Sequence, residues 1–276
     1  MTNTISSLSR LCVHTITTKP WPIEISIEKF AAAGVGGISV WREALEGREI
    51  KVTGQNIRDA GLEVIALVRG GFFPSVNKEY RVKAVNNNKK AIKEASDLGA
   101  PMVVLVCGAD PDQSLQESRN QIREGIETIL PMVVDHGIKL AIEPLHPMYA
   151  DTRSAITTMQ QANELAEYFN SDHVGVAVDV YHLWWDPTLE EEIIRCGKHD
   201  NLFAFHICDW LSPTEDMLND RGLMGEGCIP VKQIRGWVEK AGFKGYNEVE
   251  IFSTRFWSGD QDTFLENIIK AYKKDS

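Results

Sequence analysis

The segment KLAIEPLHPMYADTRSA, residues 139–155, begins like a buried strand and then changes character. The apolar run 140–142 is followed directly by Glu143 and Pro144, and His146 comes three residues after the glutamate. A strand that simply returned to solvent would more commonly end in Asp, Asn or Gly, the usual turn residues. A carboxylate and an imidazole at the end of an apolar run therefore indicate a functional site, provided that neighbouring strands end in a similar way.

Short apolar runs bounded by turn residues alternate with amphipathic segments along the chain. The predicted strands are residues 11–17, 37–41, 63–69, 102–108, 139–145, 174–182, 202–209 and 247–252. The predicted helices are residues 24–33, 48–60, 78–98, 113–136, 154–169, 188–199, 231–241 and 261–274. Several of these helices end at a glycine, as expected of a left-handed helix cap; these residues are Gly34, Gly61, Gly99, Gly137 and Gly242.

Eight strand-then-helix units predict a (β/α)₈ TIM barrel, and the apolar runs suit parallel strands that are buried on both faces. The alternative is a doubly wound open sheet, which usually carries a glycine-rich phosphate loop after its first strand. Here the first strand leads into TTKPWPIE, and GVGG at 34–37 precedes a strand instead of opening a helix. Without a linker or low-complexity segment, we expect one domain over residues 1–276.

Composition narrows the class of protein. The chain has 276 residues, 43% of them hydrophobic, and 29 basic against 39 acidic residues give a net charge of −10, which disfavours a nucleic-acid partner. The N-terminus resembles no secretory signal, and no apolar stretch approaches the length of a membrane span, so we expect no membrane partner. Five scattered cysteines without a C-x-x-C pair are typical of a reducing compartment, and we expect a cytoplasmic protein.

Four successive predicted strands carry a metal-ligand type of residue near the carboxyl end, the end at which barrel enzymes place their chemistry. They are Glu143, Asp179, His206 and Glu250. One such residue alone is more often part of a rim ion pair, but four together would bury uncompensated charge unless they bind a cation. Three carboxylates and one imidazole suit octahedral Mn²⁺, our first choice, with Mg²⁺ or Co²⁺ as alternatives, better than a closed tetrahedral zinc site.

The motifs IEP, VDVYH, HICD, GEGCIP and VEIF resemble those of the xylose-isomerase-like TIM-barrel superfamily, in particular its sugar phosphate isomerase/epimerase group. The resemblance covers nearly the whole chain. It implies that the same four residues bind the metal and that Glu143 and Glu250 act as acid and base on opposite faces of the substrate. It also implies substrate contacts for His182, in D-x-x-H, and for Arg221, in NDRG.

Further residues at the predicted mouth are less specific. Arg69 ends the third strand and suits a carboxylate or hydroxyl group, although a structural ion pair explains it equally well. Phe73 and Trp185 fall in or near loops of the same face, and aromatic rings suit the C–H surface of a sugar. His146 is either a loop residue that caps a carbonyl or a general acid/base. Glu248 adds a second acid to the last strand, where we expect it to pair with a base deeper in the barrel.

These features predict a divalent-metal-dependent isomerase or epimerase of a sugar or keto-sugar, which removes the proton α to a chelated carbonyl through an enediolate. The alternative is a lyase that eliminates the aglycone from 3-oxo-glycosides, including C-glycosides, with His146 as acid or base. The stretch EPLHPMYADTRS resembles catalytic subunits of that kind, and a small partner subunit would then be expected. For either enzyme we expect a homo-oligomer.

Overall fold

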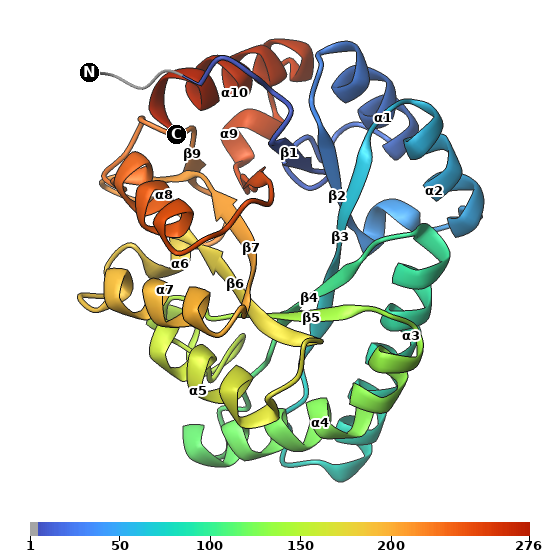
Figure 1. Ribbon diagram of the computed structural model, residues 1–276, viewed down its shortest axis with the longest axis vertical. Coiled ribbons are helices and arrows are strands. Elements are labelled where there is room, and N and C mark those ends of the chain that lie inside the picture. The colour runs from blue at the N-terminus through green and yellow to red at the C-terminus, as the bar shows by residue number, and fades with distance from the viewer. Residues whose placement is uncertain (1–4) are drawn as a thin grey trace.

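Eight parallel strands form a closed barrel in the computed structural model, which describes residues 5–276 (Figure 1). The strands are β1 (Leu11–His14), β2 (Gly37–Trp41), β3 (Glu63–Gly71), β4 (Met102–Val106), β5 (Lys139–Glu143), β6 (Val174–Asp179), β7 (Leu202–Ile207) and β10 (Asn247–Val249). They follow one another around the barrel in chain order, and β10 closes it against β1. The predicted (β/α)₈ barrel is confirmed; residues 1–4 of the predicted domain lie outside the described residues.

Eight longer helices surround the barrel (Figure 1). They are α1 (Ile23–Ala32), α2 (Ile50–Asp59), α3 (Lys78–Leu98), α4 (Leu115–Asp135), α5 (Met159–Phe169), α7 (Leu189–Lys198), α8 (Val231–Lys240) and α10 (Gln261–Asp275). Short elements follow the carboxyl ends of the strands: η1 (Arg42–Leu45), η2 (Pro147–Tyr149), α6 (Val180–Leu183), β8 (Asp209–Trp210), β9 (Arg221–Gly222) and α9 (Thr254–Trp257). The loops on this face of the barrel therefore carry most of the additional structure.

The helix ends have local causes. All five glycines predicted to end helices have positive φ, and Gly99, at φ 83°, donates its N–H to the Ala95 carbonyl. The predicted helices 113–136 and 154–169 begin later than expected, at Leu115 and Met159. The reason is that Ser114 and Thr158 act as N-caps, each accepting a hydrogen bond from an amide of the first turn.

Most of the core lies between the barrel and its helices, whereas the barrel interior is filled mainly by smaller side chains. Ala141, Ala177 and Ala204 belong to this inner cluster. Side chains alternate along a strand, so the residue two positions further on also faces inward, nearer the carboxyl end. Two positions beyond each of these alanines is a predicted ligand: Glu143, Asp179 and His206. Small side chains below thus leave room for the polar layer above.

Six of the eight strands end earlier than predicted, and two of these differences position the site. The predicted strand 174–182 stops at Asp179, whose side chain accepts a hydrogen bond from the Tyr181 amide at 2.7 Å and caps α6. The predicted strand 247–252 stops at Val249, although the Glu250 amide still donates to the carbonyl of Ile207 at 3.2 Å. Both carboxylates therefore lie where the barrel gives way to its loops.

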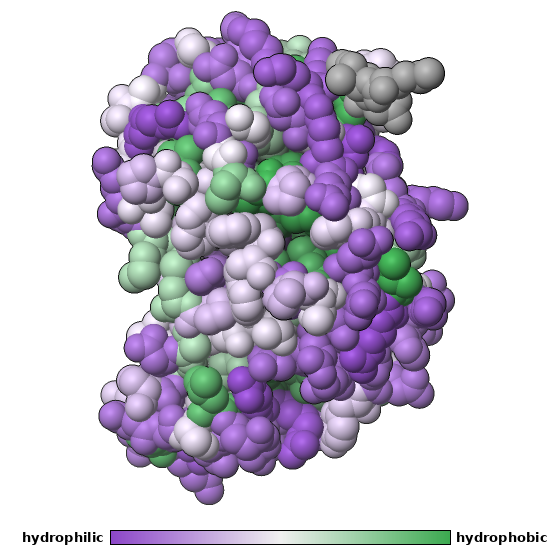
Figure 2. All heavy atoms as spheres, turned by 90° about the vertical axis from the view of Figure 1, so that its left-hand side faces the viewer, coloured by the Kyte–Doolittle hydropathy of each residue, from purple (hydrophilic) through white to green (hydrophobic). Residues whose placement is uncertain are grey.

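The outer faces of the helices are predominantly polar. The side of the molecule shown in Figure 2 is mostly hydrophilic, with hydrophobic residues in scattered small areas. None of the helices within residues 5–276 has both the length and the continuous apolar character that crossing a bilayer requires.

Candidate metal centre

The four predicted ligands converge at the carboxyl end of the barrel. Glu143 ends β5, Asp179 ends β6, His206 lies in β7 and Glu250 directly follows β10. Each contributes one ligand-type atom, these atoms lie within 4.8 Å of one another, and all four residues are buried. Residues distant in sequence meet here because neighbouring parallel strands end at the same face, and Asp179 is paired in register with His206.

Ion pairs and hydrogen bonds connect the four residues with one another and with Arg221. His206 Nδ1 lies 2.8 Å from Glu143 Oε1. Arg221 Nη1 bridges two carboxylates, donating to Asp179 Oδ2 at 3.1 Å and to Glu250 Oε2 at 2.9 Å. Arg221 Nη2 lies 3.2 Å from His182 Nε2, and the Nδ1 atom of that buried histidine has no partner among the described residues.

Beside this layer, His14 links Glu248 of β10 to Glu250, which directly follows that strand. Its Nε2 lies 3.1 Å from Glu248 Oε2 and its Nδ1 lies 3.0 Å from Glu250 Oε1. Ser39 Oγ also donates to Glu248, at 2.5 Å. Glu248 thus pairs with a basic residue, but the partner is not deeper in the barrel: the register of β1 with β10 places His14 level with Glu250. The sequence analysis missed His14, although it ends the first strand and the same rule of polar strand ends would have selected it.

Burial and charge shift the pKa values of the site. Burial raises the pKa of Asp179 to about 7, against the opposing effect of Arg221. Burial disfavours the charge on His206, but the hydrogen bond to Glu143 and the charge of Glu248 outweigh it and raise its pKa to about 10. Burial also opposes the charge on Glu250, yet His14 and Arg221 hold its pKa well below the usual range.

The donor set fits a divalent cation. Three buried carboxylates and one imidazole offer mainly hard oxygen ligands, as Mn²⁺ and Mg²⁺ prefer. In the cation-free protein, the protons of His206 and His14 and the charge of Arg221 compensate the four buried acids. A bound cation would take over part of this role, because a histidine must give up its proton at the nitrogen that binds a metal.

Two cavities adjoin the centre. The smaller one, of only about 10 Å³, lies over the ligands and is lined by Glu143, Glu250, His182 and Arg221, together with Arg153, which the sequence analysis did not select. The larger one, of about 530 Å³, contains Arg69 and opens beside the first. The two cavities share part of their walls: Trp41, Arg153, Leu218 and Phe252.

The loop 211–220 covers the smaller cavity. Leu218 contributes to both cavities, and the neighbouring Met217 carbonyl accepts hydrogen bonds from the hydroxyls of Tyr149 and of Tyr181, the latter at 3.0 Å. Two tyrosines on separate elements thus hold this loop across the mouth. Sequence reasoning had no signal for this arrangement, because the carbonyl involved belongs to an irregular segment.

The other predicted contact residues are distributed unevenly. Trp185 Nε1 donates to the His182 carbonyl at 2.8 Å, so Trp185 lies next to the site and not over the ligands. The His146 ring packs at 5.6 Å from the Trp185 ring and at 5.1 Å from the Trp210 ring. Neither His146 nor Trp185 lines the two cavities. Burial lowers the pKa of His146, which favours a neutral imidazole.

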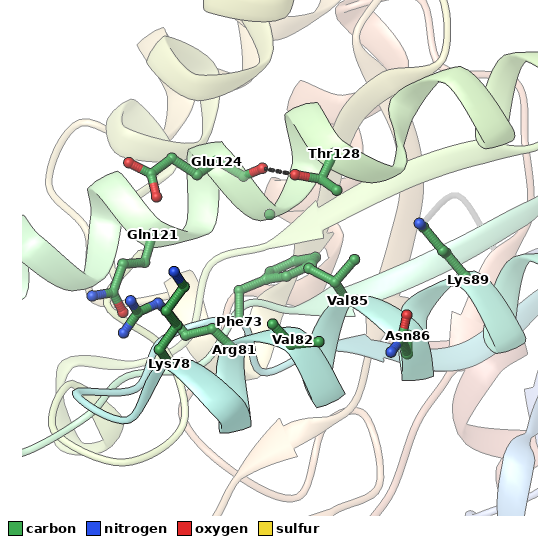
Figure 3. Close-up of a pocket in the computed structure, with 11 residues that line it drawn as sticks. Phe73, Lys78, Arg81, Val82, Val85, Asn86, Lys89, Gln121, Glu124 and Thr128 are labelled. Atoms are coloured by element: carbon green, nitrogen blue, oxygen red, sulfur yellow. Dashed lines mark hydrogen bonds between the residues drawn. The ribbon is translucent and has the colours of Figure 1, made fainter.

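The structure does not support the predicted substrate contact of Phe73. Its side chain is buried between α3 and α4, where it lines a separate pocket together with Val82 and Val85 (Figure 3). The chain turns away from the mouth at Gly71, whose φ of 104° lets its backbone approach the end of β4. After this turn the Phe73 ring packs against Gly125 of α4, so it is a core residue.

Comparison with known proteins agrees with this geometry. The inosose isomerase of Bacillus subtilis (strain 168) is 24% identical over 195 residues, which cover 67% of this chain and 66% of that protein. The chain thus matches just under two thirds of that relative's length.

Two solved structures share the fold. Protein SMc04130 from Sinorhizobium meliloti 1021 is 39% identical, with a TM-score of 0.94 over 98% of this chain and 99% of that chain. The IOLI protein with a bound zinc atom is 20% identical, with a TM-score of 0.78 over 95% of this chain and 96% of that chain, a likeness that shows the fold alone. The family model described as xylose isomerase-like TIM barrel matches residues 27–273. The chain therefore belongs to the xylose isomerase-like TIM barrel family.

Proposed function

We propose that the protein is a divalent-metal-dependent isomerase or epimerase that acts on a sugar or keto-sugar. The observation that carries this proposal is the position of Glu143 and Glu250, which belong to the ligand cluster and also line the cavity above it. A substrate carbonyl that reached this small cavity from the larger one would lie close to two carboxylates, which come from strands three positions apart in the barrel. Such an arrangement suits removal of a proton from one face of a carbon and its return from the other.

Glu143, Asp179, His206 and Glu250 would hold the cation. Their donor set favours Mn²⁺, with Mg²⁺ and Co²⁺ as alternatives; the zinc in the IOLI structure makes zinc a necessary member of any test. When bound, such an ion polarises a carbonyl and stabilises the negative charge that develops on its oxygen as an enediolate forms.

The residues of the chain would carry the proton. One glutamate takes the proton from the carbon α to the carbonyl and the other can return one, so the product depends on the carbon that receives it. His14 and Arg221 keep Glu250 ionised, so it is free to accept a proton, although the same two contacts lower its basicity. His182 is buried and its pKa lies well below the usual range, because burial and Arg221 disfavour its charge. It would therefore orient a substrate hydroxyl as a neutral ring.

The relatives support the reaction class. The inosose isomerases among them favour isomerisation over hydrolysis or redox chemistry. The expected substrate is thus a small sugar-like molecule. The homo-oligomeric state and the cytoplasmic location stay predictions. Light scattering of the purified protein tests the oligomeric state.

Metal removal tests the proposal. The protein is treated with a chelator, its metal content is measured, and each of Mn²⁺, Mg²⁺, Co²⁺ and Zn²⁺ is restored separately. Interconversion of ketoses, aldoses and an inosose is then followed by chromatography. We expect about one ion per chain and activity that returns with Mn²⁺. Full activity in the stripped protein would contradict the proposal.

Elimination from a 3-oxo-glycoside is the second candidate, because His146 packs against Trp185 and Trp210 and burial lowers its pKa, which favours a neutral imidazole. In a lyase it would move the proton that lets the aglycone leave, and His146→Ala would lower kcat by about 10²-fold or more. In an isomerase the same change would mainly raise KM. Following deuterium uptake and aglycone release separately distinguishes them: wild-type protein that releases no aglycone eliminates the lyase.

A further inference from the structure

The larger cavity beside the metal centre is strongly basic, although the protein as a whole carries a net charge of −10. Its basic lining residues are Lys19, Arg48, Arg69 and Arg153, and Glu43 is the one acidic residue of the lining. Arg48 is already neutralised by Glu24, with Nε and Oε1 2.7 Å apart. The local excess of positive charge therefore comes mainly from the other three residues, in a protein whose overall charge would repel anions.

Two of these side chains have no acidic or hydrogen-bonding partner among residues 5–276, although both lie over aromatic rings. Neither the Arg69 nor the Arg153 guanidinium forms an ion pair or a side-chain hydrogen bond within residues 5–276, and the buried Nε of Arg69 is unsatisfied. Residues 1–4 contain no acidic side chain that could supply one. Burial, followed by the neighbouring charge of Arg153, lowers the pKa of Arg69. A partly buried pair of like charges is costly unless an anion joins it.

The position of the pair connects it to the proposed chemistry. Arg153 lines both cavities, so it lies between Arg69 and the cavity that contains Glu143 and Glu250. The Arg69 guanidinium stacks over the Trp41 ring, with 5.8 Å from its central carbon to the ring centroid. Apolar walls around a guanidinium strengthen its interaction with an anion, because they exclude water.

We propose that the substrate carries an oxyanion, a carboxylate or a phosphate, which Arg69 and Arg153 bind in the larger cavity while its carbonyl lies in the smaller one. This inference rests on the proposed function and narrows its substrate class to acidic sugars. Two guanidinium forks match the paired oxygens of either group, which a neutral hydroxymethyl group cannot offer.

Three ketoses that differ only at C6 test this: D-fructose, D-fructuronate and D-fructose 6-phosphate. Their binding to the metal-loaded protein is measured by titration calorimetry, which does not require turnover. We expect at least one of the two anions to bind about 10- to 100-fold more tightly than D-fructose, as charge-assisted hydrogen bonds imply. The anion that gains more identifies the group as carboxylate or phosphate.

Substitutions assign the preference to the two arginines. Arg69→Gln and Arg153→Gln should each remove most of the preference for the anionic ketose. Arg69→Lys keeps the positive charge but not the paired guanidinium donors, so it should remove only part of this preference. Arg123→Gln, on the outer face of α4, is the matched control and should leave the preference unchanged. Thermal unfolding of each variant verifies that it is folded. If Arg69→Gln does not fold, the loss of anion preference is measured with Arg69→Lys instead.

Equal affinity for all three ketoses in the wild-type protein would overturn the inference, as would an anion preference that survives both glutamine substitutions. Proton exchange in D₂O is measured on the same samples. It tests the proposed isomerase activity independently of the anion preference. Arginine-dependent binding of an anionic ketose without any exchange would support the basic cavity and count against the isomerase.

Discussion

Metal binding should compete with protons, and pH is the perturbation that reveals it. The pKa of His206, raised to about 10, means that this ring is protonated at neutral pH in the cation-free protein. The pKa of Asp179, raised to about 7, means that a second ligand is partly protonated there. A cation binds only the deprotonated forms, so its affinity should increase with pH.

The magnitude follows from the number of protons displaced. Between pH 7 and pH 9 one proton leaves His206, so the Kd for Mn²⁺ should fall by about tenfold per pH unit. Well below pH 7 the proton on Asp179 must leave too, and the dependence should steepen to about a hundredfold per unit.

Calorimetry in buffers of different ionisation enthalpy measures the protons released, and competition with a chelator measures the Kd. We expect release of about one proton per ion at pH 8. Glu143→Gln removes the carboxylate charge that helps to raise the pKa of His206, so it should flatten the profile. Tight binding at pH 8 without proton release would refute this reasoning.

Other predictions concern catalysis and packing. Glu143→Gln and Glu250→Gln should each lower turnover by about 10²–10⁴-fold at full metal loading, measured by steady-state kinetics; unchanged rates would exclude that glutamate as acid or base. Gly125→Ala should destabilise the protein by about 1–3 kcal/mol in urea unfolding, because the added Cβ would overlap the buried Phe73 ring. Gly236→Ala, in a helix with open space around it, should instead stabilise by about 0.5–1 kcal/mol, and equal effects at both glycines would contradict the packing argument.

Local patterns in the sequence were sufficient to predict the barrel. Apolar runs located all eight strands, and glycines with positive φ marked five helix ends. The polar strand ends also brought Glu143, Asp179, His206 and Glu250 together as expected. These features succeed because a parallel barrel aligns the carboxyl ends of its strands, so that position along a strand predicts position in space.

Features that depend on irregular backbone were not predictable in this way. Phe73 seemed to follow its strand to the mouth, but the turn at Gly71 directs it between two helices. Arg153 lies ten residues beyond Glu143 in a segment without periodicity, and only the folded loop brings it to the cavities. The covering contact at Met217 likewise depends on a backbone carbonyl, which carries no sequence signal.

Exchange of the α-proton in D₂O tests the central claim most directly. Wild-type protein loaded with Mn²⁺ is incubated with an inosose and with the three C6-matched ketoses, and deuterium is followed by NMR at the carbons next to the carbonyl. We expect that deuterium enters at such a carbon, that a chelator stops this exchange, and that Glu143→Gln and Glu250→Gln slow it by about 10²-fold or more. Exchange at the same rate in the stripped protein, or in both glutamine variants, would contradict it.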